Sequence, residues 1–200
     1  MNNRLLSLLS IGLCLLPYVA SAKRPNIVFM FSDDHACNAI SAYPGGLFDK
    51  IAPTPNIDRI ATEGMLFENS FCANSICGPS RANILTGKHS HLNGFLDNNS
   101  SYFDGKQQTF PQLLRDTGYQ VAMIGKWHLK KEPNFDYYKV LPGQGKYFDT
   151  MFRIQGPKKW PQNTITHECQ HSSEAITDSA LDWFRNKRNP DKPFFVCHQY

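Results

Sequence analysis

The segment Cys77-Gly78-Pro79-Ser80-Arg81 holds the residue types best suited to chemistry. Pro79 is typical of the first turn of a helix, and the amino end of a helix attracts anions through its free N–H groups and its dipole. Cys77 and Arg81 are four residues apart, so a helix would place both on one face. A nucleophile beside a guanidinium suits a tetrahedral oxyanion. From these residues alone, the segment is a thiol nucleophile, an anion-binding site or a structural cysteine.

The acidic pair Asp33-Asp34 follows the apolar run Asn26–Ser32, which is rich in β-forming residues. Two carboxylates at the end of a buried strand repel each other and are costly to desolvate, so they require a cation. Ligation by oxygen atoms alone suits Ca²⁺ or Mg²⁺. The pair therefore indicates a metal site at the carboxyl end of the first strand.

Lys126 and His128 form a third candidate group. They are two residues apart, so an extended backbone would point both side chains to one face. A cation and a titratable imidazole that face one site fit the binding of an anionic substrate. The alternative is a surface lysine beside an unrelated histidine.

Alternating strands and helices must position these groups. This alternation predicts an α/β fold with a largely parallel sheet, in which ligands gather at the carboxyl ends of the strands. In the helix at 56–64, Asn56 is the expected N-cap and Gly64 the stop. We expect strands at 26–32, 65–72, 120–124 and 193–198, helices at 56–64, 79–87, 109–117 and 172–187, a long loop at 135–159, and a buried face of Ala175, Ile176, Ala180, Leu181 and Phe184 on the last helix.

Composition and the N-terminus define the class of protein. The chain has 200 residues, 41% of them hydrophobic, and a formal net charge of +4 without a basic block, so nucleic-acid binding is not supported. Arg4, the apolar run Leu5–Leu16 and Ala20-Ser21-Ala22 together predict a signal peptide at 1–22, and a periplasmic or secreted protein. An uncleaved membrane anchor is the alternative, but the apolar run is short for a span. No later segment is apolar enough to cross a membrane.

The cysteine count points to an unpaired thiol. Of six cysteines, Cys14 lies in the signal peptide, which leaves Cys37, Cys72, Cys77, Cys169 and Cys197. An odd number in an exported chain means that at least one is free, reactive or modified. We expect that residue to be Cys77.

Taken together, these motifs resemble the type I sulfatase family. Cys77–Arg81 followed by Leu85-Thr86-Gly87 looks like the family's signature, in which the cysteine is oxidised to formylglycine by a maturation enzyme. The segment 25–34 is similar to the family's opening motif, and Gly125-Lys126-Trp127-His128 to a later one. Further similar segments are 53–58, 109–119 and 193–195, so the resemblance covers nearly all of residues 23–200.

This resemblance implies an alkaline-phosphatase-like fold and a set of roles. Asp33, Asp34 and the modified Cys77 would bind the metal, expected to be Ca²⁺ rather than Mg²⁺. Arg81 and Lys126 would contact the sulfate, and His128 the sulfate or the leaving oxygen. His35, His89 and His91 are expected to lie outside the catalytic set. The family also uses a further Asp, an Asn, His or Gln, a Lys and a His from later segments, so we interpret residues 23–200 as the N-terminal part of a catalytic domain.

The substrate is expected to be a sulfated carbohydrate. Val140–Gly145 with Tyr147-Phe148 resembles a loop of bacterial N-acetylglucosamine-6-sulfatase-like and mucin-desulfating members, so the 6-O-sulfate of N-acetylglucosamine is the expected target. A surface loop without substrate contact is the alternative. Two other functions stay open: a phosphate or phosphonate monoester hydrolase of the same superfamily, and an inactive truncated remnant.

Overall fold

A six-stranded sheet forms the centre of the protein in a computed structural model that describes residues 23–43, 45 and 51–200. The strand order is β1-β6-β2-β3-β4-β5. β1, β6, β2 and β3 run parallel, whereas β4 and β5 form an antiparallel extension. The predicted α/β class with a largely parallel sheet is therefore confirmed. The strands are β1 Ile27–Phe31, β2 Gln120–Lys126, β3 Tyr137–Leu141, β4 Phe148–Ile154, β5 Thr164–His171 and β6 Phe194–Gln199.

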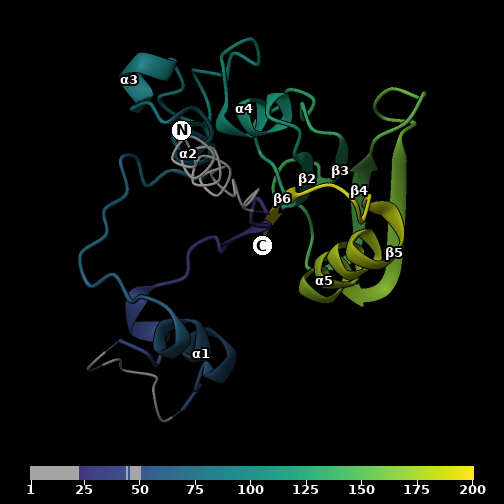
Figure 1. Cartoon of the computed structure of the whole chain (residues 1–200). Coiled ribbons are helices and arrows are strands. Elements are labelled where there is room, and N and C mark those ends of the chain that lie inside the picture. The colour runs from purple at the N-terminus through teal and green to yellow at the C-terminus, as the bar shows by residue number, and fades with distance from the viewer. Residues whose placement is uncertain (1–22, 44, 46–50) are drawn as a thin grey trace, which may run out of the picture.

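Helices cover both faces of this sheet. α2 and α4 lie on one side and α5 on the other, whereas α1 lies away from the sheet at the end of a long connection (Figure 1). The π-helical segment η2 continues α5 directly. The helices are η1 Cys37–Ala39, α1 Pro55–Glu63, α2 Cys77–Thr86, α3 Ser90–Asn93, α4 Phe110–Asp116, α5 Ser172–Asp182 and η2 Trp183–Lys187.

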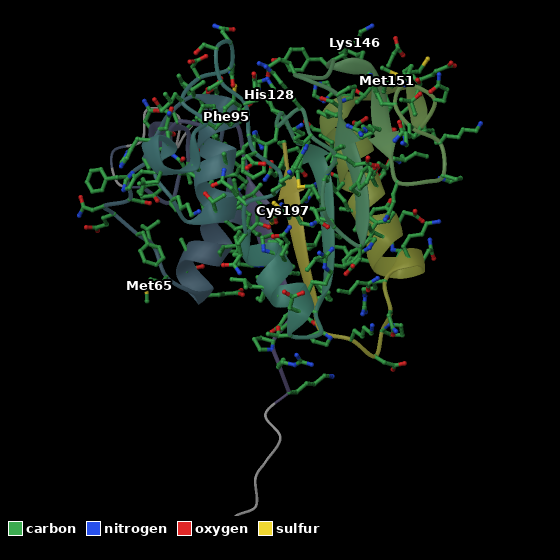
Figure 2. All side chains as sticks on the ribbon, turned by 90° about the horizontal axis from the view of Figure 1, so that it is seen from above. Met65, Phe95, His128, Lys146, Met151 and Cys197 are labelled. Carbon is green, nitrogen blue, oxygen red and sulfur yellow. The ribbon has the colours of Figure 1, made fainter. Side chains whose placement is uncertain are left out.

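The central strands β2 and β6 are buried on both faces, which explains why their sequences are continuous apolar runs. In β6, Phe195 and Cys197 pack into the cluster on the α2 and α4 side. Phe194 and Val196 pack into the cluster under α5. Figure 2 shows Cys197 in the middle of the sheet and Met65 at the periphery.

Local signals account for several helix boundaries. α4 begins with a capping box between Thr109 and Gln112. The C-cap of α2 is Gly87, whose φ of 65° is a conformation that glycine adopts at little cost. Gly64 ends α1 as predicted, but the prediction that Asn56 is its N-cap was wrong. The helix begins at Pro55, which is preorganised for the first turn, so Thr54 occupies the N-cap position.

Two predicted segments differ in the structure. Residues 65–72 form no strand, and Phe71 is 91% exposed. β-forming residues need a neighbouring strand to pack against, and this segment has none among the described residues. The predicted loop at 135–159 instead contains β3 and β4. Two of its three glycines and one of its two prolines lie in the short connection between these strands.

Smaller differences concern helix faces and starts. Ala175, Ile176 and Ala180 are buried as predicted, but Leu181 is 38% exposed. Its position on α5 turns it away from the sheet. α2 begins at Cys77, two residues before the predicted start at Pro79. This places the cysteine inside the first turn.

The predicted signal peptide at 1–22 lies outside the described residues, so export stays a prediction. Within the described part, no helix is both long and apolar enough to cross a membrane.

Candidate active site

Cys77 is the first residue of α2 and is half-buried. Its backbone neighbour Gly78 donates its N–H to Asn98 Oδ1 at 3.3 Å, and Asn98 Nδ2 donates to Cys77 Sγ at 3.2 Å. A Cβ on Gly78 would lie 2.5 Å from Asn98 Oδ1 and 2.8 Å from the Phe95 ring, so this position requires glycine. Asn98 therefore fixes the side chain of residue 77 at the amino end of the helix.

Arg81 lies one turn further along α2 and is 1% exposed. Its Nη1 donates to the carbonyl of Lys126 at 3.0 Å and to Gln199 Oε1. Its Nη2 lies 3.6 Å from Asp33 Oδ1. Burial lowers the pKa of Arg81, and the Asp33 charge opposes this shift. The guanidinium thus connects α2 with the carboxyl ends of β2 and β6, and with the acidic pair that follows β1.

Lys126 at the end of β2 forms an ion pair with Asp33. The side chains of Lys126 and Asp33 are 10% and 23% exposed, so the pair is largely shielded from water. The preceding Gly125 has a φ of 102°, and a Cβ there would lie 1.7 Å from the carbonyl oxygen of Gln199. Only glycine permits this close approach of β2 to β6 beside the site.

The carboxylates of Asp33 and Asp34 can supply oxygen ligands for a hard cation. Asp33 already faces two cationic side chains, whereas Asp34 forms no ion pair with a described residue. Asp34 also has a φ of 51°, which redirects the chain directly after Asp33. The described residues contain no group of three or more His, Cys, Asp or Glu that could hold a metal. The predicted set of Asp33, Asp34 and Cys77 is therefore not assembled as a metal site among the described residues, and the acidic pair offers only some of the oxygen donors that such a cation needs.

His128 lies beyond the end of β2 with a φ of 54°. This backbone is left-handed, so the expectation that an extended chain aligns Lys126 with His128 was wrong. The imidazole nevertheless lies close enough to interact with the charged site residues: burial lowers its pKa most, and the charges of Lys126 and Arg81 lower it further. His128 Nδ1 is buried and has no hydrogen-bond partner among the described residues.

The other histidines lie in different surroundings. His35 is exposed and lines a hollow of about 450 Å³ together with Asp33, Asp34 and Cys77. His89 and His91 follow the carboxyl end of α2 and stack on each other, with ring centroids 5.8 Å apart. Cys77 is at the opposite end of that helix, so His89 and His91 stay outside the candidate site.

A cleft of about 480 Å³ opens beside the charged residues. Asp33, Asp34 and Lys126 line it together with the connection 144–147 between β3 and β4, and with Tyr200. His128 and Lys146 lie at the same end of the molecule in Figure 2. The loop singled out from the sequence therefore borders the acidic pair.

Sequence analysis missed two polar residues at the site, Asn98 and Gln199, and indicated Gln144 only as part of the loop Val140–Gly145. Gln199 is 3% exposed at the end of β6 and accepts a hydrogen bond from Arg81. Its place after a buried apolar strand is the same signal that indicated Asp33 and Asp34, so it could have been found. Asn98 carries no such signal, because its contact with Cys77 depends on the path of a loop.

All five cysteines of the described region are free thiols. Cys197 is 1% exposed, and burial raises its pKa to about 12. Its thiol is therefore protonated and shielded, whereas Cys77 lines an open hollow.

Comparisons with known proteins point to one family. The sulfatase family model matches residues 25–199. N-acetylglucosamine-6-O-sulfatase of Bacteroides thetaiotaomicron is 47% identical over 98% of this chain and 33% of its own length. N-acetylgalactosamine-6-sulfatase of Rattus norvegicus is 30% identical over 86% of this chain and 38% of its own length. The chain thus spans about a third of the length of these curated relatives.

Solved structures show the same fold. A structure in complex with its substrate, D-glucosamine-2-N,6-O-disulfate, has a TM-score of 0.79 and 48% identity, and covers 88% of this chain and 34% of the other. A phosphonate monoester hydrolase of Agrobacterium radiobacter has a TM-score of 0.64 at 17% identity over 88% of this chain and 40% of its own. At that identity the second likeness concerns the fold alone.

Proposed function

Because this chain belongs to the sulfatase family, we propose that the full-length protein hydrolyses sulfate esters, using a formylglycine formed from Cys77 and a divalent metal. One observation carries the proposal. Cys77 starts α2 beside a cluster in which Arg81 and Lys126 both pair with Asp33, and this cluster borders an open cleft. A nucleophile at a helix amino end, with two cations beside it, suits an anionic sulfuryl group.

The side chain of residue 77 is the proposed nucleophile. Formylglycine in its hydrated form carries two hydroxyls on one carbon, and one of these oxygens attacks sulfur as the S–O bond to the leaving alcohol breaks. Loss of the proton from the second hydroxyl then expels sulfate and restores the aldehyde. A serine or an unmodified cysteine has no second hydroxyl, which explains the need for the modification. The maturation enzyme that makes formylglycine is thus a proposed partner.

The surrounding residues hold and neutralise the transferred group. Arg81 is fixed by Lys126 and Gln199, so its orientation does not have to form during the reaction. Lys126 sits at the cleft and places a second positive charge there. His128 is the proposed proton donor to the leaving alcohol, or shares that role with a later histidine.

The divalent metal is assigned to Asp33 and Asp34, whose oxygen donors suit Ca²⁺ or Mg²⁺, and Ca²⁺ is the ion that the family resemblance favours. When bound, it would act as a Lewis acid that lowers the pKa of the attacking hydroxyl. Asp34 is free of ion pairs with described residues, whereas Asp33 pairs with the two cations Arg81 and Lys126. The remaining ligands would come from outside the described residues.

The proposed substrate is a sulfated amino sugar, in particular the 6-O-sulfate of N-acetylglucosamine in a glycan. The relative that is 47% identical is an N-acetylglucosamine-6-O-sulfatase, which supports this choice. The position of residues 144–147 at the cleft also supports it, because Tyr147 is exposed there and an aromatic face can stack on a sugar. The signal-peptide pattern at 1–22 favours action in the periplasm or outside the cell.

A substrate panel tests the proposed function. The full-length protein, produced with a maturation system, is assayed with sulfated monosaccharides, an aryl sulfate, an aryl phosphate and a phosphonate ester. We expect release of sulfate, fastest from N-acetylglucosamine-6-sulfate. Preference for the phosphorus esters would replace the sulfatase assignment by the alternative hydrolase, and preference for a sulfated galactose would overturn only the substrate.

A further inference from the structure

The turn between β3 and β4 is built around two glycines. Gly145 donates its N–H to the carbonyl of Pro142 at 3.2 Å, which closes the turn. Gly143 and Gly145 have φ values of 58° and 76°, conformations that other residues rarely adopt. A Cβ on Gly145 would also lie 2.8 Å from the side chain of Leu141. The backbone therefore fixes the position of Gln144 between these glycines, although Gln144 itself is exposed.

The Gln144 amide points toward the proposed nucleophile. Its Nε2 lies 3.9 Å from Cys77 Sγ and makes no other hydrogen bond with a described residue. Gln144 also lines the cleft that contains Asp33 and Lys126. The Gln144 amide is therefore placed within reach of a group bound at residue 77.

Distances separate the roles of Gln144 and Asn98. The sulfur of Cys77 occupies the position that a hydroxyl oxygen would take in hydrated formylglycine, because both atoms are bonded to Cβ of residue 77. Asn98 Nδ2 is 3.2 Å from that sulfur, and its Oδ1 is held by Gly78, so Asn98 fixes the nucleophile. Gln144 Nε2 lies further from the sulfur than Asn98 Nδ2 does, at 3.9 Å against 3.2 Å, so its contact with the same atom is the weaker of the two. The gap leaves room for an oxygen of a group bonded to the nucleophile.

We propose that Gln144 donates a hydrogen bond to a sulfuryl oxygen of the group transferred to residue 77, and is thus a catalytic residue. This inference rests on the proposed function. Charge on the sulfuryl oxygens changes as the S–O bonds form and break, so a positioned N–H donor stabilises the transition state. Because Gln144 belongs to the connection that also carries Lys146 and Tyr147, sugar binding and sulfuryl transfer would share one rigid turn.

Three variants of the full-length protein test this role. Gln144→Ala removes the donor, and Gln144→Glu replaces it with an anion of the same shape. Gln155→Glu makes the same charge change on an exposed glutamine that follows β4, and serves as the control. Each is assayed with N-acetylglucosamine-6-sulfate and with an aryl sulfate, and its affinity for inorganic sulfate is measured by calorimetry.

We expect Gln144→Ala to lower kcat/KM about 10- to 100-fold for both esters, and to weaken sulfate binding about tenfold. Gln144→Glu should lose more, because its carboxylate repels the anion, and Gln155→Glu should stay within about twofold of the wild type. A loss confined to the sugar substrate would show that Gln144 contacts the sugar, and an unchanged kcat/KM would exclude any role. If the wild type hydrolyses no sulfate ester, the proposed function fails, and sulfate affinity alone still decides whether Gln144 contacts the anion.

Discussion

Cys77 and Cys197 both lie within electrostatic reach of Arg81, yet they occupy contrasting regions of the protein. Cys197 is in the middle of β6, enclosed by the cluster under α2 and α4, and burial raises its pKa to about 12. Cys77 begins α2 and lines a hollow together with the acidic pair. The same guanidinium therefore stands beside one inert thiol and one candidate nucleophile.

This difference shows that access and the helix amino end, rather than residue type or a nearby cation, distinguish the functional cysteine. It also separates two kinds of constraint. The interior around Cys197 depends on close packing, whereas the edge around Cys77 depends on charges and donors that meet at strand ends. Substitutions around Cys77 should consequently lower activity, whereas substitutions around Cys197 should lower the free energy of unfolding.

The largest effect is expected at the edge. Cys77→Ala in the full-length protein should lower sulfatase activity by at least about 10⁴-fold, because the proposed nucleophile is lost. The midpoint of thermal unfolding should stay nearly unchanged, since Cys77 is only half-buried. Peptide mass spectrometry across residue 77 of the wild type, made with a maturation system, should detect formylglycine. An unmodified thiol in that sample would contradict the proposed chemistry.

The acidic pair should show the next largest effect. Replacing Asp33 and Asp34 together with Asn should remove the bound metal and lower activity by about 10³-fold or more, because a Lewis acid contributes several kcal/mol. Metal content is measured by elemental analysis and activity in the same samples. An Asp178→Asn variant, on the exposed side of α5, controls for the loss of negative charge. If metal and turnover both survive the double change, the metal site lies elsewhere.

Much of this edge was predictable from sequence, because motif residues follow buried strands. The run at 26–32 and the strand at 120–124 placed Asp33 and Lys126 at carboxyl ends, and parallel strands bring such ends together. The donor Asn98 was not predictable, since a loop rather than a periodic pattern carries it to Cys77, and Gln144 was indicated only as part of the loop Val140–Gly145. β3 and β4 were hidden for a related reason: the turn glycines between them read as part of one irregular segment, although Tyr138 and Val140 are buried.

Gly125 lies where β2 closely approaches β6, and its substitution should lower the free energy of unfolding. Gly125→Ala would place a Cβ 1.7 Å from the carbonyl oxygen of Gln199, at a φ of 102°. Both strands would have to shift, so we expect a loss on the order of 3 kcal/mol or more in the free energy of unfolding. Gly156→Ala, where a Cβ meets nothing within 4 Å, is the matched control. Urea unfolding of both variants measures the difference, and equal stability would mean that the close approach of β2 to β6 is absent.

Cys197→Ala should have a smaller effect in the interior. Removing the buried sulfur leaves a small cavity and deprives Gln199 Nε2 of an acceptor 2.9 Å away. We expect a loss of about 1–2 kcal/mol in the free energy of unfolding, with most activity retained. Cys169→Ala, at an exposed position, should cost little. A larger loss of activity than of stability would place Cys197 in the chemistry and remove the contrast with Cys77.

The smallest effect concerns pH and His198, the neighbour of Cys197 in β6. His198 is 8% exposed, its Nε2 has no hydrogen-bond partner among the described residues, and burial lowers its pKa. The unfolded chain therefore binds a proton at His198 more readily than the folded chain does. The free energy of unfolding should be unaffected by this group above the ordinary histidine pKa of about 6.5, and should fall as the pH drops below it.

His198→Gln removes the titrating group, so the free energy of unfolding of this variant should decline less than that of the wild type between pH 7.5 and pH 5.5. His91→Gln, at an exposed histidine, should follow the wild type. Urea unfolding at the two pH values measures the declines, and an equal decline in all three proteins would mean that His198 is hydrated rather than enclosed beside Cys197.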